Sequence, residues 1–488
     1  MTSGVPPKLA LGSRGVNFAA DVVDAADPDR LALVELARDG TRREWSFGAV
    51  ADGSARLAGT LAAHGVGRGD VVMTVVGNRP EWVLAMVACF RIGAVALPCT
   101  EQLRAKDLRL RLDAARPKLV VADERDRAEV DAARPRCDVL WVPDPSLLAA
   151  PPAEAVALEE EDPLLITFTS GTAGEPKPIR HAQRYWEGQR LQAEHWLDAR
   201  PGDLVWCTAS SGWSKSARNV FIAPWLRGAS ALLHDARFDP EERLALLERE
   251  RVDVLCMAPT EYRVIAKRAR LRRFEKLRGL VAAGEALNPE VLRAWEEATG
   301  LQIRDGYGQT ETGQLTGAPP CEPVRPGSMG RALPGVRLWI EDGELVADPA
   351  TVPTFCLGPP RDAPWRTGDR VRRDEDGFLF FEGRADDVII SAGYRIGPFE
   401  VESALVAHPA VAEAAVVAAP DPERGSIVRA VVVLRPGHEP GDALARELQD
   451  HVKGETAPYK YPRRVDFASE LPKTASGKIR RAFLREAL

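Results

Sequence analysis

Hydroxyls, glycines and a lysine are concentrated in residues 167–177, which read Thr-Phe-Thr-Ser-Gly-Thr-Ala-Gly-Glu-Pro-Lys. The two glycines let backbone N–H groups approach a ligand closely, and successive N–H groups can form an anion-binding nest. The hydroxyls of Thr169, Ser170 and Thr172 add donors, and Lys177 adds a positive charge. The segment is therefore a candidate phosphate cradle, although a surface turn rich in Ser, Thr and Gly has a similar composition.

This loop lacks the ending of a Walker A motif. That motif continues from Gly-Lys into Ser or Thr and opens a helix there. Lys177 instead lies between Pro176 and Pro178, which disfavours a helix through the lysine. The sequence therefore indicates a nucleotide site of a different class.

Residues 305–313 form a second polar segment, Asp-Gly-Tyr-Gly-Gln-Thr-Glu-Thr-Gly. Tyr307 offers a ring that could stack on a base, and Glu311 is an oxygen ligand suited to Mg²⁺. Further along, the Trp-Arg-Thr-Gly-Asp run that ends at Asp369 provides a carboxylate for the hydroxyls of a ribose. Both segments could also be solvated loops, so neither establishes a site by itself.

Three more cationic residues follow in polar, glycine-bearing segments. Arg384 and Arg395 supply guanidinium forks for phosphate or ribose oxygens, and Lys478 lies on a loop near the C-terminus. Any one of them could belong to a surface salt bridge or a charged tail. All the segments together, in this order, indicate one nucleotide-dependent active site.

Length and composition describe an ordinary globular protein with two or more domains. The 488 residues exceed what one compact core accommodates, and 45% hydrophobic with 28% charged residues is a typical balance. A net charge of −6 gives no reason to expect a nucleic-acid partner. The seven cysteines are scattered without a C-x-x-C pair, and no signal peptide is evident. We therefore expect reduced thiols and a cytoplasmic location.

Helix-like and strand-like runs alternate over the first two-thirds of the chain. Apolar residues at helical spacing over 47–63 precede a strand-like run at 71–76, and the alternation continues to 252–256. Repeated βα units predict parallel sheets covered by helices. The apolar segment 82–99 is short for a membrane span and is interrupted by Arg91, which favours a buried helix followed by a strand.

The last hundred residues have a different pattern. Strand-like runs at 387–390, 411–419 and 427–434 are combined with helical patterns at 398–408 and 442–453. The expected fold class is therefore an α/β N-terminal domain, built on βα units with parallel sheets, plus a small α+β C-terminal domain.

With these motifs the chain resembles the adenylate-forming superfamily of acyl-CoA synthetases, firefly luciferase and peptide-synthetase adenylation domains. It is most similar to the acetyl-CoA and medium-chain acyl-CoA synthetase branch, through the segments 211–213, 306–309, 391–398 and 457–462. The resemblance implies an ATP-dependent acid–thiol ligase that uses Mg²⁺ and CoA. A carboxylate attacks the α-phosphate of ATP to give acyl-adenylate and pyrophosphate, and the CoA thiol then displaces AMP.

The resemblance also implies roles for the motif residues. Lys478 would contact the acyl carboxylate and the α-phosphate, and Glu311 with Thr172 would hold Mg²⁺, which makes Lys478 and Glu311 the candidate catalytic residues. Asp369 and Arg384 would bind the ribose. The implied ATP-binding residues are Thr169, Ser170, Gly171, Thr172, Ala173, Gly174, Glu175, Pro176, Lys177, Gly284, Glu285, Ala286, Asp305, Gly306, Tyr307, Gly308, Gln309, Thr310, Asp369, Arg384, Arg395 and Lys478.

In this superfamily the small C-terminal domain rotates between the two half-reactions. The implied hinge is Asp386, which divides an ATP- and acyl-binding domain, 1–385, from a mobile domain with the catalytic lysine, 386–488. Rotation would withdraw Lys478 from the site. The candidate CoA contacts by similarity are Gln102, Gly393, Tyr394, Arg424, Lys453 and Tyr461, although surface cations are usually solvated.

The acyl pocket is expected to accept more than acetate. Related short-chain enzymes have a Trp before the Gln-Thr-Glu triplet, whereas this chain has Gly308, which implies room for a medium-chain, branched or aromatic acid. Trp213 is expected to line a wall or to be an ordinary core aromatic. Lys215 and Arg218 would allow a second carboxylate on the substrate if one pointed into the pocket, but we expect them to face CoA phosphate or solvent.

Two departures from the family pattern and two rival functions remain. The family usually has Gly where this chain has Pro178, and the segment 344–365 lacks the aromatic run common in relatives.

One rival function is an adenylating enzyme that loads a carrier-protein phosphopantetheine, and the other is a nucleotide-binding homologue without catalysis. The expected partners are a small carboxylate, ATP and CoA, without nucleic acid or a membrane span, and a homodimer is allowed.

Overall fold

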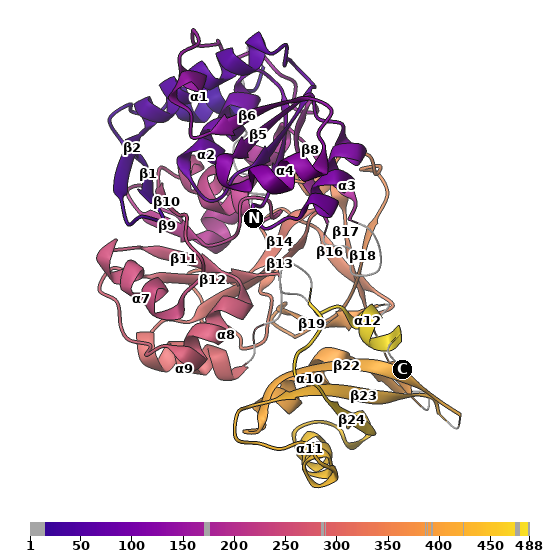
Figure 1. Cartoon of the computed structure of the whole chain (residues 1–488). Helices are drawn as coiled ribbons and strands as arrows, with labels where there is room; N and C mark the ends of the chain where they lie inside the picture. Colours follow the sequence, from indigo (N-terminus) through magenta and orange to yellow (C-terminus); the bar gives the residue numbers. More distant parts are fainter. Residues whose placement is uncertain are drawn as a thin grey trace, which may run out of the picture.

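The computed structural model describes residues 15–169, 176–284, 287, 289–385, 387, 389–391, 394–422, 424–473 and 479–486. Within these ranges the strands form five sheets. Figure 1 shows that the last hundred residues, coloured orange to yellow, form a small unit below a larger body.

The first large sheet of the body has the strand order β6-β5-β3-β4-β7-β8. Its pairs are parallel except for the last one, β7 with β8, which is antiparallel and leaves β8 at the edge. Its strands are β3 (Val71–Val75), β4 (Val95–Cys99), β5 (Leu119–Asp123), β6 (Asp138–Val142), β7 (Pro163–Phe168) and β8 (Pro178–Ala182).

The second large sheet has the order β15-β14-β13-β12-β11-β9-β10-β1-β2 and is parallel from β13 to β1. The carboxyl ends of its parallel strands therefore meet at one edge, where ligands bind in open α/β sheets. Its strands are β1 (Leu31–Leu36), β2 (Arg42–Ser46), β9 (Leu204–Cys207), β10 (Ser230–His234), β11 (Val254–Met257), β12 (Gly279–Ala283), β13 (Ile303–Gln309), β14 (Gly313–Gly317) and β15 (Arg331–Ala332).

Helices between the strands follow the predicted alternation. Helix α1 (Phe47–Ala63) begins after Ser46, whose hydroxyl accepts a hydrogen bond from the Ala49 N–H at 3.2 Å. Helix α2 (Pro80–Arg91) is almost entirely buried, as expected for the apolar run that ends in β4. None of the helices in the described ranges combines the length and apolarity needed to cross a bilayer.

The other helical segments of the body are short to medium in length. They are η1 (Ala19–Asp24), α3 (Ala105–Ala115), η2 (Glu124–Asp126), α4 (Arg127–Ala133), η3 (Pro145–Leu148), α5 (Arg184–Gln192), η4 (Ala193–Leu197), η5 (Arg218–Ile222), α6 (Ala223–Leu226), α7 (Pro240–Arg249), α8 (Pro259–Arg268), α9 (Pro289–Thr299) and η6 (Pro349–Thr351).

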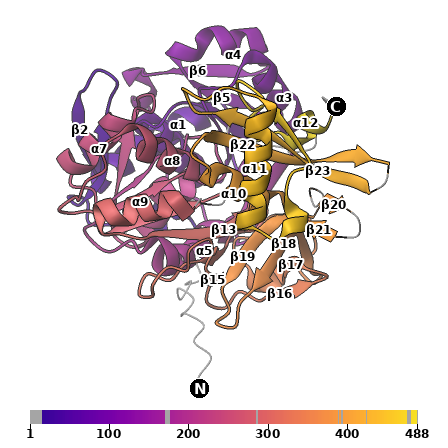
Figure 2. The same cartoon turned by 90° about the horizontal axis from the view of Figure 1, so that it is seen from below.

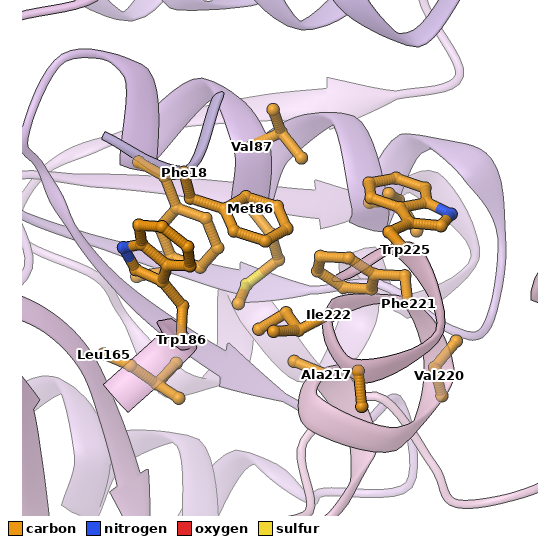
Figure 3. Packing of buried hydrophobic residues seen from close by; sticks show 14 of the residues in the cluster. Phe18, Met86, Val87, Leu165, Trp186, Ala217, Val220, Phe221, Ile222 and Trp225 are labelled. Atoms are coloured by element: carbon orange, nitrogen blue, oxygen red, sulfur yellow. The ribbon is translucent and has the colours of Figure 1, made fainter. Parts of the chain in front are cut away.

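An aromatic cluster fixes the segment η5–α6 against the body. Phe221 and Trp225 have ring centroids 5.0 Å apart, and Phe18 packs edge-on against Trp186 at 5.7 Å (Figure 3). All four side chains are buried. Because such interiors are close-packed, the backbone that begins at Arg218 is held in one position.

A four-stranded antiparallel sheet, β16-β17-β18-β19, joins the body to the small unit. Its strands are β16 (Leu338–Glu341), β17 (Glu344–Ala347), β18 (Trp365–Arg373) and β19 (Leu379–Arg384). Between β18 and β19 the Gly377 N–H donates to the Asp374 carbonyl at 3.0 Å, which forms a hairpin turn. This hairpin places Asp369 opposite Arg384.

The C-terminal unit is an α+β structure. Strand β23 pairs antiparallel with β22 and parallel with β24, and β20 pairs with β21. Helices α10 and α11 pack on the three-stranded sheet through residues such as Leu405, Leu448 and Val416, and Figure 2 shows α11 in front of α10. The elements are β20 (Ile389–Ser391), β21 (Tyr394–Ile396), α10 (Pro398–Ala407), β22 (Val411–Asp421), β23 (Gly425–Leu434), α11 (Asp442–Glu455), η7 (Pro458–Lys460), β24 (Arg464–Phe467) and α12 (Arg481–Glu486). The predicted fold class is confirmed, whereas the domain boundary at 385/386 stays a prediction.

Candidate active site

A cleft of about 1580 Å³ lies between the body and the C-terminal unit. The predicted ATP-binding residues that line it are Thr169, Pro176, Lys177, Gly284, Asp305, Gly306, Tyr307, Gly308, Gln309, Thr310, Asp369 and Arg384. Segments that are far apart in the sequence thus converge on one space. Ser170, Gly171, Thr172, Ala173, Gly174, Glu175, Glu285, Ala286, Asp386, Gly393, Lys478 and the side chain of Arg395 lie outside the described residues.

A hydrogen-bond network orders the wall of the cleft around Asp369. The Tyr307 hydroxyl and the Gln309 amide both donate to Oδ2 of Asp369, the amide at 3.0 Å, and Arg384 lies 3.2 Å from Oδ1. The Trp365 indole N–H donates to the Gln309 carbonyl oxygen at 3.0 Å. Burial raises the pKa of Asp369 above its ordinary value, and its donors oppose this shift. A carboxylate with fixed donors on one side presents its remaining lone pairs in a defined direction.

Asp305 is a second buried carboxyl group in this wall, in the first half of β13. Its Oδ1 accepts a hydrogen bond from the Gly306 N–H at 2.8 Å. Burial raises the pKa of Asp305 well above the ordinary value, and the opposing influences include the positive charge of Lys215. A buried carboxyl group of this kind can take part in hydrogen bonding at the cleft in either protonation state.

Glu311 lies beside this network, and among the described residues its carboxylate has no hydrogen-bond donor. Its backbone carbonyl accepts from the Cys356 N–H at 2.8 Å, but no described residue donates to its side chain. Burial and the charge of Glu311 together raise the pKa of the Cys356 thiol to about 11. A half-buried carboxylate without a partner on the lining of a cleft fits a hard cation such as Mg²⁺.

The base of the phosphate loop is closed by two hydrogen bonds. The Thr169 N–H donates to the Lys177 carbonyl at 3.0 Å, and the Lys177 N–H donates to Oγ1 of Thr169 at 3.2 Å. Pro178 is the first residue of the edge strand β8, opposite Phe168 of β7. Proline is tolerated at the first residue of an edge strand, where its missing N–H breaks no central ladder. The departure from the family glycine thus has a structural explanation.

The structure corrects the reason that we expected for Gly308. The residue lines the cleft, but a Cβ on Gly308 would come within 1.8 Å of the Gly313 carbonyl oxygen. The missing side chain therefore makes room for the neighbouring strand β14 and not for the substrate. The strand pair β13–β14 changes register between Tyr307 and Gly308, which marks the same close approach.

The helical segment after Trp213 contributes two cations to the cleft. Trp213 is half-buried and lines the cleft, which is the first of the two positions expected for it, a wall of the site or the core. The Lys215 ammonium group donates to the Ala283 carbonyl at 3.0 Å. Arg218 also lines the cleft and is only 6% exposed. We expected Arg218 to face CoA phosphate or solvent: the solvent-facing orientation is wrong, because the residue is buried, and a contact with CoA stays a prediction.

His181 is a residue beside the site that sequence reasoning missed. It is buried in β8, and its ring packs at a tilt against Tyr185 with the ring centroids 4.3 Å apart. Burial, assisted by the nearby charge of Arg218, lowers the pKa of His181 to about 3. A single histidine in a short strand gives no sequence signal, since its importance depends on neighbours that only the fold supplies.

The predicted CoA contacts do not converge in this arrangement. The Lys453 ammonium group lies 4.4 Å from the centre of the Tyr461 ring, and Tyr394 is 52% exposed and stacks on Tyr459. Within the described ranges no contact joins Gln102 or Arg424 to them, and none of the five described candidates lines the cleft. Their role stays a prediction that depends on another orientation of the C-terminal unit.

The C-terminal unit closes one side of the cleft. Lys473 and Ile479, which flank residues 474–478, both line it, and Lys473 pairs with Glu413 at 2.6 Å. The Lys267 ammonium group of α8 donates to the Ala412 carbonyl at 3.0 Å, a direct contact between the body and the unit. In this orientation Lys473 and Ile479, the ends of the predicted lysine loop, line the same cleft as Tyr307, Gln309 and Asp369. We call the part of the lining formed by these last three residues the nucleotide wall.

Known proteins resemble the chain over almost its whole length. The AMP-binding enzyme family matches residues 21–353, and the AMP-binding enzyme C-terminal domain matches 400–478. The chain is 40% identical to "Acyl-coenzyme A synthetase ACSM4, mitochondrial" of Rattus norvegicus, over 97% of this chain and 90% of that protein. It is also 40% identical to "Acyl-coenzyme A synthetase ACSM5, mitochondrial" of Mus musculus, over 98% and 92%.

Solved structures agree with these sequence matches. An acyl-CoA synthetase of Brucella canis is 35% identical, with a TM-score of 0.75 over 98% of this chain and 95% of that one. The anthranilate CoA ligase AuaEII in complex with anthranoyl-AMP is 28% identical, with a TM-score of 0.87 over 97% of each chain. The names of the similar synthetases also overturn one expectation: both proteins are named mitochondrial, so the expectation of a cytoplasmic location is wrong.

Proposed function

This chain belongs to the AMP-binding enzyme family, and on that premise we propose that it activates a medium-chain, branched or aromatic carboxylate at the cleft described above. It is an AMP-forming acyl-CoA synthetase that uses ATP, Mg²⁺ and CoA. One observation carries the substrate proposal: the nucleotide wall, Trp213 and the flanks of residues 474–478 share a single cleft. A cleft of this volume has room for a carboxylic acid beside a bound nucleotide.

In the first half-reaction an oxygen of the substrate carboxylate forms a bond to the α-phosphorus of ATP. The bond from that phosphorus to the bridging oxygen breaks, and pyrophosphate leaves with the electron pair. The negative charge that gathers at phosphorus requires fixed positive charge. We assign this role to Lys478, with the phosphate loop that begins at Thr169 and ends at Lys177 holding pyrophosphate.

Residues of the body position the nucleotide for this step. Asp369, oriented by Tyr307 and Gln309, would accept hydrogen bonds from the ribose hydroxyls. Arg384 would add a donor at the same place. Mg²⁺, which Glu311 and the predicted ligand Thr172 would hold, supplies charge neutralisation at the phosphates.

In the second half-reaction the sulfur of CoA attacks the acyl carbon of the adenylate. The bond from that carbon to the AMP oxygen breaks, AMP leaves with the electron pair, and the thiol proton is released. For this step we propose that the C-terminal unit rotates about Asp386, which withdraws Lys478 and brings Gly393 and Tyr394 to the cleft.

A carboxylate panel with ATP and CoA tests the proposal. Release of AMP and formation of acyl-CoA are followed by mass spectrometry for straight, branched and aromatic acids, with a holo-carrier protein as the competing thiol. We expect acyl-CoA from acids longer than propionate. Acid-dependent pyrophosphate release without any acyl-CoA would favour the carrier-protein alternative, and no acid-dependent release at all would favour a non-catalytic homologue. A homodimer also stays a proposal, which light scattering of the purified chain would test.

A further inference from the structure

Arg218 is a buried cation that faces the cleft, and no described residue accepts a hydrogen bond from it. Its residue is 6% exposed, its side chain lines the cleft, and its Nε is buried without a hydrogen-bond partner. Within the described ranges no carboxylate lies within salt-bridge distance of its guanidinium group. Burying a charge without a partner is costly, so this arrangement calls for an explanation.

The other buried arginines of the described chain all have partners. Each of these side chains has at least one polar partner: Arg91 pairs with Asp24, Arg184 with Glu161, Arg243 with Glu261 and Arg429 with Asp466, and Arg304 donates to the carbonyls of Trp196 and Leu197. The Nε of Arg91 is also buried without a hydrogen-bond partner, but the Nη2 of the same guanidinium group pairs with Asp24. The fold therefore compensates such groups elsewhere. Among the buried arginines of the described chain, Arg218 is the one that lines the cleft, and it is also the one to which the described residues offer no acceptor.

His181, Tyr185 and Cys256, whose pKa values the charge of Arg218 lowers, carry no negative charge near neutral pH. His181 is uncharged there, because burial lowers its pKa to about 3. Burial also raises the pKa of the Tyr185 hydroxyl, and hydrogen bonding with Cys207 and burial raise the pKa of the Cys256 thiol well above the ordinary value. Lys215, three residues earlier, adds a second positive charge to the same lining. The site is thus electropositive and lacks its counter-charge.

The arginine is also held in place. It begins the π-helical turn η5, whose residues Val220, Phe221 and Ile222 are buried in the aromatic cluster (Figure 3). The adjacent Asn219 accepts a hydrogen bond from Gln192 at 3.0 Å. Single π-helical turns occur frequently at functional sites. Because this backbone is fixed, Arg218 cannot reach solvent by a movement of η5 alone.

We propose, building on the proposed function, that the substrate is a dicarboxylic acid whose second carboxylate binds Arg218. One carboxylate would be activated at the nucleotide wall, and the other would take the guanidinium group as its counter-ion, with Lys215 nearby. Arginine suits this role because its planar fork matches a carboxylate bidentately. An acid that ends in a methyl group would leave the guanidinium group buried and unpaired, and would therefore bind less well.

The test compares straight-chain monocarboxylic and α,ω-dicarboxylic acids of equal length in acyl-CoA formation. The measured quantity is the ratio of kcat/KM for the diacid to kcat/KM for the monoacid, in the wild type, Arg218→Met and Arg218→Lys. We expect the wild type to favour the diacid at one or two chain lengths. Arg218→Met should lower that ratio roughly 10- to 150-fold, and Arg218→Lys should lower it less.

A matched control and a second readout separate recognition from misfolding. Arg304→Met removes a buried guanidinium group outside the cleft and should leave the diacid-to-monoacid ratio unchanged. Without ligand, Arg218→Met should unfold at the same or a higher temperature, because it removes an uncompensated charge. The preferred diacid should raise the unfolding temperature of the wild type but not that of Arg218→Met.

The outcomes distinguish this inference from the proposed function. If monoacids are better substrates than diacids at every length, or if Arg218→Met leaves the ratio unchanged, the assignment of Arg218 is wrong while the synthetase activity stands. If Arg218→Met instead raises KM for CoA alone, the guanidinium group serves the thiol substrate and the inference is overturned. Failure of all acids to form acyl-CoA would contradict the proposed function itself.

Discussion

Tyr307 donates a hydrogen bond to Asp369, and this contact joins β13 to β18 across 62 positions of sequence. The amide of Gln309 donates to the same carboxylate oxygen at 3.0 Å. Two motifs that the sequence presents as separate loops are therefore one wall of the cleft. An enzyme that must hold ribose in one orientation benefits from such a preorganised acceptor.

Tyr307→Phe should destabilise the protein in a pH-dependent manner. Burial already raises the pKa of Asp369 above its ordinary value near 3.9, and loss of the tyrosine donor raises it further. Between the unfolded and folded pKa values the native state then binds more protons, so its stability falls as pH rises through that window. Urea unfolding should show a loss of about 1–3 kcal/mol near pH 7.5 and a smaller loss near pH 5.

The control for this effect is Tyr262→Phe. The Tyr262 hydroxyl is also buried but bonds to the backbone carbonyls of Leu255 and Val281, both at 3.2 Å, and not to a carboxylate. Its removal should cost the same free energy of unfolding at both pH values. A loss for Tyr307→Phe that did not change with pH would show that the hydroxyl does not act on the Asp369 carboxylate.

Lys478→Ala should abolish most adenylation and spare thioester formation from preformed acyl-adenylate. A fixed positive charge at the α-phosphate contributes roughly 100- to 1,000-fold to the rate of a step that develops negative charge. Pyrophosphate exchange measures the first half-reaction, and acyl-CoA formation from synthetic acyl-adenylate measures the second. Lys473→Ala, which removes the partner of Glu413 in the same segment, is the matched control and should retain both activities to a larger extent. Equal losses in the two half-reactions of Lys478→Ala would argue against a rotating unit.

Lys267→Met should slow adenylation more than thioester formation. The ammonium group donates to the Ala412 carbonyl and so stabilises the orientation in which the C-terminal unit closes the cleft. Loss of one such hydrogen bond corresponds to roughly a 2- to 10-fold change in the population of that orientation. The same two half-reaction assays measure it, with Lys118→Met as a control, because Lys118 pairs with Asp70 within the body. If Lys267→Met slowed thioester formation alone, the hydrogen bond between Lys267 and Ala412 would belong to the orientation used in the thiol step, and this prediction would be wrong.

Gly308→Ala should destabilise the fold and should not narrow the acyl pocket. The added Cβ would meet the Gly313 carbonyl oxygen at 1.8 Å, so β13 and β14 must separate. We expect a loss of about 1–3 kcal/mol in the free energy of unfolding, measured with urea. Gly454→Ala in α11, where no atom lies within 4 Å, should instead gain about 0.5–1 kcal/mol. A shift toward shorter acids without loss of stability would restore the pocket role of Gly308.

Local patterns in the sequence were sufficient for most of the elements. The run predicted as a helix at 47–63 is α1 with the same bounds, and the strand-like run at 71–76 is β3. Both predictions succeed because hydrophobic periodicity and an N-terminal Ser depend on neighbours in the chain. Asp369 and Arg384 could also be identified as motif residues from the local sequence, because each lies in a polar segment between apolar runs.

The tertiary structure was needed wherever the role of a side chain depends on distant neighbours. Gly308 was interpreted as an opening for the substrate, but the Gly313 carbonyl of the next strand occupies that direction. Arg218 was expected to face CoA phosphate or solvent, but it is buried on the lining of the cleft, at the start of the tightly packed segment η5. Backbone clashes and burial are properties of pairs far apart in sequence, which no local pattern contains.

The motifs of the sequence thus determined the reaction class through the family resemblance that they carry, whereas residue types and spacings alone indicated a nucleotide-dependent site. The sequence also determined the two-part fold, because periodicity and turn residues act over short stretches of chain. Only the tertiary structure decided which groups share the cleft and which cation there lacks a partner. Charge compensation is settled by distances in space, and for that reason Arg218 gained a proposed ligand only once its surroundings were known.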